Sequence, residues 1–228
     1  MEIFEYSNKG QREVNQDYVV HRGLSPDSAI FVVADGMGGY AHGEVASKVV
    51  SDSIVDFVES NLGKLAPEKL LREAIIFAND ELMLKRMALG TKKMGTVVSA
   101  LLVIGTSAYI CWLGDSRVYA FRDGEVTYKT EDHSIVSQMA KMQAITPDAY
   151  SKYSNIVTRC LMGDDQLGEV PVDSIKVHSR DVFVLCSDGF HKELNMNWAL
   201  NYDDTQKEEL DRKADNISDN YSFIKVVV

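Results

Sequence analysis

The stretch from residue 30 to residue 44, IFVVADGMGGYAHGE, constrains the fold more than any other part of the chain. Its first five residues form a short apolar run rich in β-branched side chains, which is typical of a buried strand. The run ends at Asp35, and Gly36 begins a glycine-rich turn whose backbone can approach a bound group closely. From Gly43 onward, apolar residues recur at helical spacing. The sequence therefore predicts a strand, an Asp-Gly turn and a helix, with a carboxylate held at the strand end.

The same placement of aspartate recurs along the chain. Asp115 and Asp188 each follow another apolar run, whereas Asp17 and Asp219 each stand just before one. A single aspartate at a strand end is usually a turn former or a cap. Five aspartates at strand ends favour one shared site.

Composition limits the class of protein. The chain has 228 residues, 45% of them hydrophobic, and shows no linker or repeat, so we expect residues 1–228 to form a single domain. The net charge of −10 argues against a nucleic-acid partner. The three cysteines predict no disulfide, and neither a membrane span nor a signal peptide is apparent. We expect a cytoplasmic monomer.

The rest of the sequence predicts two long helices followed by several strands. Helical periodicity covers residues 44–62 and 67–89, and short strands follow from residue 94. Arg122-Asp123-Gly124-Glu125 is typical of a hairpin turn between two of these strands. Residues 145–165 are mixed and polar, which predicts a long irregular excursion of the kind that is often functional.

The aspartates indicate a particular chemistry. Carboxylate oxygens are hard ligands suited to Mg²⁺, Mn²⁺ or Ca²⁺, and such a cluster without cations would raise its own pKa values. Two divalent ions can activate water for attack on phosphorus, which predicts a metal-dependent phosphohydrolase. A structural calcium site is the alternative, but its ligands usually lie within about twelve residues. Arg12, a few residues before Asp17, could bind an oxyanion through two N–H groups.

Eight short segments occur in an order and spacing that are together highly specific. They read GQREVNQD at 10–17, VVADGMGG at 32–39, GEVAS at 43–47, GT at 95–96, GDSR at 114–117, DHS at 132–134, SDG at 187–189 and DN at 219–220. In these segments the chain resembles, essentially end to end, the bacterial-type metal-dependent serine/threonine protein phosphatases of the protein phosphatase 2C (PPM) family.

The resemblance implies an α+β fold: a four-layer α-β-β-α sandwich in which two packed antiparallel sheets are flanked by helices. It implies two core Mn²⁺ or Mg²⁺ ions between the sheets, and a bridging hydroxide that attacks phosphoserine or phosphothreonine. By position, the resemblance implies that the core metals are held by Asp17, Asp35, the Gly36 carbonyl, Asp188 and Asp219. It implies that Asp115, with Asp188, holds a weaker third ion and that Arg12 binds the substrate phosphate. The implied catalytic residues are Arg12, Asp35 and Asp188. The excursion at 145–165 resembles a flap that modulates substrate choice. The implied partners are a phosphorylated protein and a serine/threonine kinase or its targets.

The chain departs from the family pattern at a few positions. Tyr40 stands where histidine is common, and a histidine appears instead at His42. Gln16 replaces a frequent glutamate, which could weaken metal affinity modestly. Val97 stands where a second threonine is frequent. None of these changes removes a ligand carboxylate.

Two rival interpretations remain. Cys111 and Arg117 fit the Cys-x5-Arg spacing of cysteine-dependent phosphatases, but Asp115 would repel the phosphate and a strand continues after the arginine. The other rival is a non-catalytic relative that binds phosphoproteins, against which the retention of every expected carboxylate argues. Neither His42 nor His133 is expected to be catalytic.

Overall fold

The structure, a computed structural model, describes residues 1–37, 42–142, 144–164 and 167–228. The predicted strand and helix around the glycine-rich stretch are confirmed: β3 (Ser28–Gly36) ends at the glycine after Asp35, and α1 (Gly43–Asn61) begins at Gly43. Tyr40 and the two glycines before it lie outside the described residues.

In the part of the chain that the structure describes, ten strands form two antiparallel five-stranded sheets. The first sheet has the order β1 (Glu2–Asn8), β10 (Tyr221–Val227), β9 (Val182–Cys186), β6 (Arg117–Arg122) and β7 (Glu125–Lys129). The second has the order β2 (Asp17–Ser25), β3, β4 (Thr96–Ile104), β5 (Ser107–Leu113) and β8 (Val172–Lys176). The predicted hairpin joins β6 to β7, with Asp123 and Gly124 both at positive φ.

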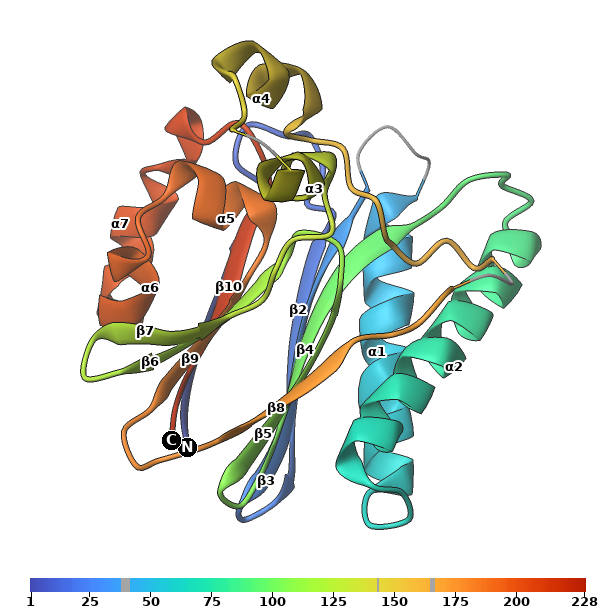
Figure 1. The fold of residues 1–228 in the computed structure, drawn as a ribbon, viewed down its shortest axis with the longest axis vertical. Coiled ribbons are helices and arrows are strands. Elements are labelled where there is room, and N and C mark those ends of the chain that lie inside the picture. The colour runs from blue at the N-terminus through green and yellow to red at the C-terminus, as the bar shows by residue number, and fades with distance from the viewer. Residues whose placement is uncertain (38–41, 143, 165–166) are drawn as a thin grey trace.

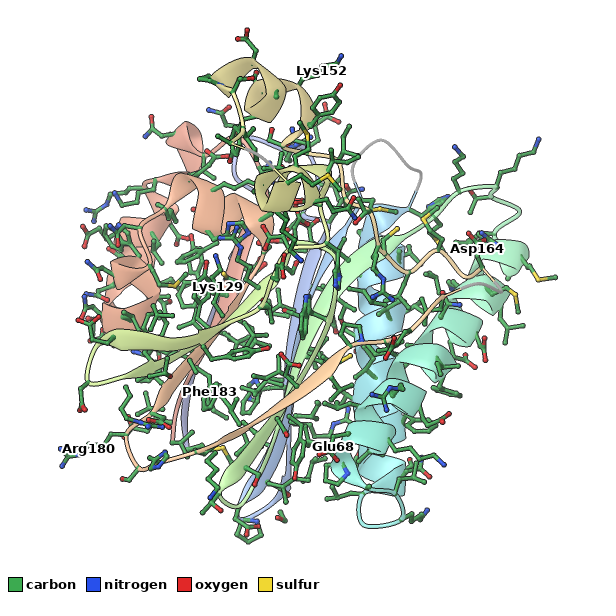
Figure 2. The ribbon with its side chains drawn as sticks, viewed as in Figure 1. Glu68, Lys129, Lys152, Asp164, Arg180 and Phe183 are labelled. Carbon is green, nitrogen blue, oxygen red and sulfur yellow. The ribbon has the colours of Figure 1, made fainter. Side chains whose placement is uncertain are left out.

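Helices cover the outer face of each sheet, as Figure 1 shows. The helices α1 and α2 (Pro67–Ala88) pack on the second sheet, and α5 (Asp188–Glu193), α6 (Asn197–Asn201) and α7 (Lys207–Asp211) lie on the first. Side chains fill the space between the sheets, Phe183 among them (Figure 2). The predicted four-layer α-β-β-α sandwich is therefore confirmed.

The alternation of side chains explains why the layers form and where the aspartates point. Along β3, Ile30 and Val32 pack toward α1 and α2, whereas Phe31 and Val33 pack between the sheets. Because side chains alternate along a strand, Asp35 continues the face of Phe31 and Val33. The carboxylate at the end of β3 is thus directed toward the opposite sheet.

The excursion at 145–165 is only partly irregular, which corrects the prediction. Residues Pro147–Tyr153 form α4, because Thr146 accepts a hydrogen bond from the N–H of Ala149 and a proline fills the first turn. Further on, Leu161 forms an isolated bridge with Thr96 of β4. The excursion is therefore anchored at the end of the second sheet.

The remaining helical elements are short. They are α3 (Ile135–Met142) and the 3₁₀ turns η1 (Asp204–Gln206) and η2 (Ala214–Asn216). Within the described ranges, no helix has the length and apolar character needed to cross a membrane.

Candidate metal centre

Asp17 and Asp35 come from neighbouring strands and stand directly opposite each other in the ladder of β2 and β3. Asp17 is buried, with 7% of its surface exposed. Like charges that stand directly opposite each other on two antiparallel strands destabilise the pairing of those strands. The two carboxylates therefore require a proton or a cation between them.

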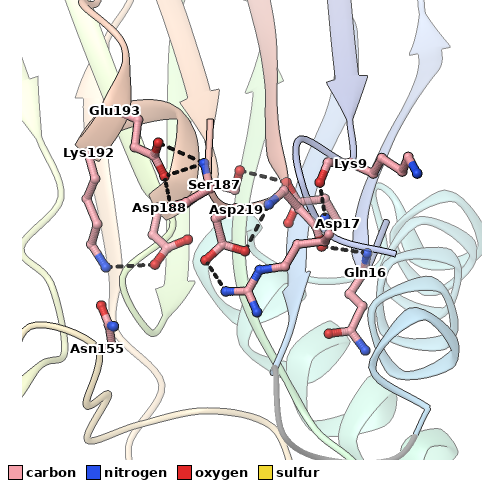
Figure 3. Close-up of polar contacts among 12 residues, drawn as sticks. Lys9, Gln16, Asp17, Asn155, Ser187, Asp188, Lys192, Glu193 and Asp219 are labelled. Atoms are coloured by element: carbon pink, nitrogen blue, oxygen red, sulfur yellow. Dashed lines mark hydrogen bonds and ion pairs between the residues drawn. The ribbon is translucent and has the colours of Figure 1, made fainter. Parts of the chain in front are cut away.

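Two further aspartates reach the same place from the first sheet. Asp188 is the first residue of α5, directly after β9, and Asp219 lies just before β10. Since β9 and β10 are antiparallel neighbours, the end of one meets the start of the other. Asp35, from the second sheet, and Asp188 line the same cavity. Figure 3 shows Asp17, Asp188 and Asp219 gathered at this end of the sheets.

Most of the predicted site residues line one cavity of about 430 Å³. Those that line it are Arg12, Asp35, Asp115, Asp188 and Asp219, together with residues 155–157 that follow α4. Asp17 is buried beside them, and Gly36 donates its N–H to the Gln16 carbonyl at 3.0 Å. The structure thus brings together side chains that are separated by up to 207 residues.

The carboxylates perturb each other's ionisation. Burial, followed by repulsion from Asp188 and Asp219, raises the pKa of Asp17 to about 7. Burial, together with the charges of Asp17 and Asp188, also raises the pKa of Asp35 well above its ordinary value. The pKa of Asp115 is raised to about 6, again chiefly by burial. The cluster therefore favours positive charge at its centre.

The donor set fits divalent cations that prefer oxygen. In the described part of the chain, no group of three or more acidic, histidine or cysteine side chains is arranged to hold a metal ion outright. However, Oδ1 of Asp17 is buried with no hydrogen-bond partner, while its Oδ2 accepts a hydrogen bond from Ser187 Oγ at 2.7 Å. A buried carboxylate oxygen without a partner is costly unless something binds it. The oxygen chemistry matches Mg²⁺ or Mn²⁺.

Asn220 fixes the loop that carries Arg12. Its Nδ2 donates to the carbonyl of Lys9 at 2.9 Å, and its Oδ1 accepts from the N–H of Gln16 at 2.8 Å. Arg12 has 52% of its side chain exposed, and its Nη2 donates to Asp219 Oδ2 at 2.9 Å. The loop and the strand start at residue 219 are therefore one unit.

Two glycines pack closely against the backbone of this strand start. A Cβ at Gly10, where φ is +56°, would lie 2.3 Å from the carbonyl oxygen of Asp219. A Cβ at Gly189 would lie 2.1 Å from the carbonyl oxygen of Asn220. Only glycine fits at either position without displacing backbone.

Lys192 is a site residue that the sequence analysis missed. Its Nζ donates to Asp188 Oδ2 at 2.7 Å and lies 3.5 Å from Asp115 Oδ2 (Figure 3 shows the Asp188 contact). Burial alone would raise the pKa of Asp188, but the ammonium group lowers it below its ordinary value. A lysine four residues after an aspartate at a helix start was the available clue, because such side chains are neighbours on a helix.

The family model for protein phosphatase 2C matches residues 6–215. The chain belongs to the protein phosphatase 2C family. Its most similar relatives include the serine/threonine phosphatase Stp of Listeria welshimeri, 31% identical over 196 residues, which are 82% of this chain and 75% of Stp. Another is the serine/threonine protein phosphatase PstP of Mycobacterium tuberculosis, 29% identical over 187 residues. That match covers 80% of this chain but 35% of PstP, so the chain spans about a third of the length of that relative.

The fold matches solved structures of the same family. The catalytic domain of PstP, solved in complex with two manganese ions, superposes with a TM-score of 0.81 at 27% identity. The superposition covers 100% of this chain and 98% of that one.

The Cys-x5-Arg match does not form a phosphate-binding loop in this member of the family. Cys111 lies within β5, fully buried among the side chains beneath α1 and α2, and burial raises the pKa of its thiol to about 12. Arg117 begins β6 in the other sheet and forms two hydrogen bonds with Asp132, both 2.7 Å long. A thiol with a raised pKa is a poor nucleophile near neutral pH.

The two histidines considered from the sequence lie apart from the carboxylates. The ring of His133 stacks on Trp112, and its Nδ1 accepts a hydrogen bond from the N–H of Gly114 at 3.2 Å. His42 begins α1 in a left-handed conformation, with Nδ1 3.9 Å from Glu44 Oε1. Neither histidine lines the cavity that holds the aspartates.

Proposed function

We propose that this chain is a serine/threonine protein phosphatase that hydrolyses phosphoserine and phosphothreonine with the help of two divalent cations, Mn²⁺ or Mg²⁺. The observation that carries the proposal is the pair Asp17 and Asp35, opposite each other in the ladder, with Asp188 and Asp219 brought to them from the other sheet. Membership of the family and the names of the relatives support the same activity.

The cations would be held by oxygen atoms from both sheets. The proposed ligands are Asp17, Asp35, the carbonyl of Gly36, Asp188 and Asp219. When bound, two such ions supply Lewis acidity, which lowers the pKa of water and offsets charge on the phosphoryl oxygens. The unpartnered Oδ1 of Asp17 supports this assignment.

Arg12 would position the phosphate. Its guanidinium is exposed at the rim of the cavity, and its hydrogen bond to Asp219 is donated by a single nitrogen atom, Nη2. Since arginine has five N–H donors in a planar fork, it can donate to a phosphate while it keeps that bond. Arg12 therefore orients the substrate relative to the aspartates.

The segment after α4 would select the substrate. Asn155, Ile156 and Val157 line the same cavity as the aspartates. A phosphorylated segment of a partner protein that enters this cavity would contact these side chains. We infer that the excursion at 145–165 acts as a flap on phosphoprotein substrates, which would include targets of a serine/threonine kinase.

We also infer that residues 1–228 act as one phosphatase domain. The site draws on Arg12 near the beginning and Asp219 near the end, and both sheets contribute ligands. A fragment that lacked either sheet would lose half of the carboxylates.

Hydrolysis of a phosphothreonine peptide tests the proposal. Phosphate release is measured with Mn²⁺, with Mg²⁺ and with a chelator, for the unmodified protein and for Asp188→Asn. We expect release that requires the metal and falls more than about a hundredfold in the variant, as expected for loss of a group that acts in the chemical step. Asp56→Asn, which alters an exposed carboxylate paired with Arg22, is the matched control.

Other outcomes would contradict the proposal in distinct ways. Activity that survives the chelator would point away from a metal mechanism. Full activity in a folded Asp188→Asn protein would exclude this site. Binding of the phosphopeptide with no phosphate release under any condition would favour the non-catalytic role.

A further inference from the structure

A positively charged side chain already stands between two of the aspartates. Nζ of Lys192 lies 2.7 Å from Asp188 Oδ2 and 3.5 Å from Asp115 Oδ2. These are the two carboxylates that the family resemblance assigns to a weaker third cation. The ammonium group is therefore placed where that ion would have to bind.

The contact differs from an ordinary surface ion pair. Exposed pairs contribute little, because water screens both charges. Here 25% of the Lys192 side chain is exposed, and the side chains of Asp115 and Asp188 are 6% and 17% exposed. Water therefore screens this contact less than it screens an ion pair on the surface.

Further contacts link the segment that carries Lys192 to Asp115 and to α4. The residue before the lysine, His191, has its Nε2 3.0 Å from the backbone carbonyl oxygen of Asp115. Nζ of Lys192 also lies 3.5 Å from the carbonyl oxygen of Ser154, at the end of α4. The ammonium group accordingly has three oxygen neighbours, from Asp115, Ser154 and Asp188.

We propose that the ammonium group of Lys192 permanently takes the place of a third cation between Asp115 and Asp188, so that this chain binds two divalent ions and no third. The inference rests on the proposed function, because it presupposes the two core ions. It reassigns Asp115 from a metal ligand to the partner of a lysine. It also links that position to α4, since the same ammonium group reaches the Ser154 carbonyl.

Counting bound Mn²⁺ tests the proposal without any measurement of activity. Equilibrium dialysis with elemental analysis, extended to millimolar Mn²⁺, gives the number of ions per folded chain. We expect two for the unmodified protein and three for Lys192→Ala, with the third ion bound more weakly. Asp115→Asn in the Lys192→Ala background should return the count to two. Lys129→Ala, which removes a positive charge from the cavity next to Lys192, should leave it at two.

The variants also separate the possible failures. Lys192→Met, which keeps most of the aliphatic stem, replaces the alanine variant if that protein does not fold. Three ions on the unmodified protein would overturn the proposal, because they would show that metal displaces the lysine. Two ions on every lysine variant would overturn it as well. No ion on any of the proteins would instead refute the proposed two-metal function, and the inference with it.

Discussion

Arg12 and Asp219, 207 residues apart in the sequence, are joined by an ion pair of 2.9 Å at the mouth of the carboxylate cavity. Arg12 occupies the loop that Asn220 joins to the start of β10, so the group proposed to bind phosphate and a proposed metal ligand belong to one hydrogen-bonded unit. We therefore expect the Arg12 loop and the start of β10, which are joined, to contact both the substrate and a cation.

Replacement of Arg12 by alanine should weaken substrate binding. A hydrogen bond to a charged group contributes about 1.5–3 kcal/mol, which corresponds to a loss of roughly 10- to 150-fold in kcat/KM. Arg12→Lys keeps the charge but loses the planar fork, so its kcat/KM should lie between that of the unmodified protein and that of Arg12→Ala. Steady-state kinetics on a phosphothreonine peptide provide the measurement. Unchanged kinetics in both variants would remove Arg12 from the site.

Replacement of Gly189 by alanine should displace the strand start that carries Asp219. The added methyl group would lie 2.1 Å from the Asn220 carbonyl oxygen, and overpacking of this kind costs about 1–3 kcal/mol of unfolding free energy. Mn²⁺ affinity and turnover should both fall. Gly23→Ala is the matched control, because nothing lies within 4 Å of its added Cβ. Equal denaturation midpoints and Mn²⁺ affinities for the two variants would contradict this account.

Replacement of Cys111 by serine should separate stability from activity. The hydroxyl group would be buried among apolar side chains, and an unpaired buried hydroxyl costs about 1–3 kcal/mol. The melting temperature should fall, while kcat/KM of the folded protein stays within about twofold. Cys111→Ala is a second variant for the case in which the serine protein does not fold. Near-total loss of activity in both folded proteins would restore the thiolate mechanism.

Replacement of His133 by asparagine should change the pH dependence of stability. Burial lowers the pKa of His133 to about 4 from 6.5, so the unfolded chain binds a proton in an interval where the folded chain does not. This contribution is present above pH 6.5 and is lost as the pH falls toward 4. Asparagine keeps an acceptor for the Gly114 N–H and has no such titration.

Thermal melting of the two chelator-treated proteins between about pH 7 and about pH 4.5 provides the comparison. The unmodified protein should lose stability more steeply than His133→Asn as the pH falls. Parallel curves would show that the ring remains unprotonated in both states or is protonated in both.

The elements that the sequence predicted well are those in which apolar residues recur at a regular spacing. The change from an apolar run to helical spacing after Asp35 located β3 and α1 to within a residue or two. The aspartates at strand ends were found for the same reason, since a charge that interrupts an apolar run is conspicuous. The recurrence of aspartates at strand ends favoured one shared site, the family resemblance assigned their roles, and the structure brings Asp35, Asp188 and Asp219 into one cavity.

Other elements lacked such a pattern. The strand β8 (Val172–Lys176) was not predicted, because it is a partly exposed edge strand with polar residues at its centre. The helix α4 has no buried residue, so no apolar periodicity marked it within the excursion. Lys192 was missed because a lysine on a short charged helix is normally solvated. Its role depends on Asp115, whose distance from it is set only by the packing of α5 against the strands.

The place of β10 in the first sheet has a consequence for biosynthesis. This strand lies between β1 and β9, yet it is made from residues 221–227. A ribosome-bound chain that has not yet released these residues has β1 without its neighbour and Asp219 not yet in place. Pairing over so many residues is also slow compared with local folding. We therefore expect the growing chain to lack the complete carboxylate cluster until its last strand is inserted.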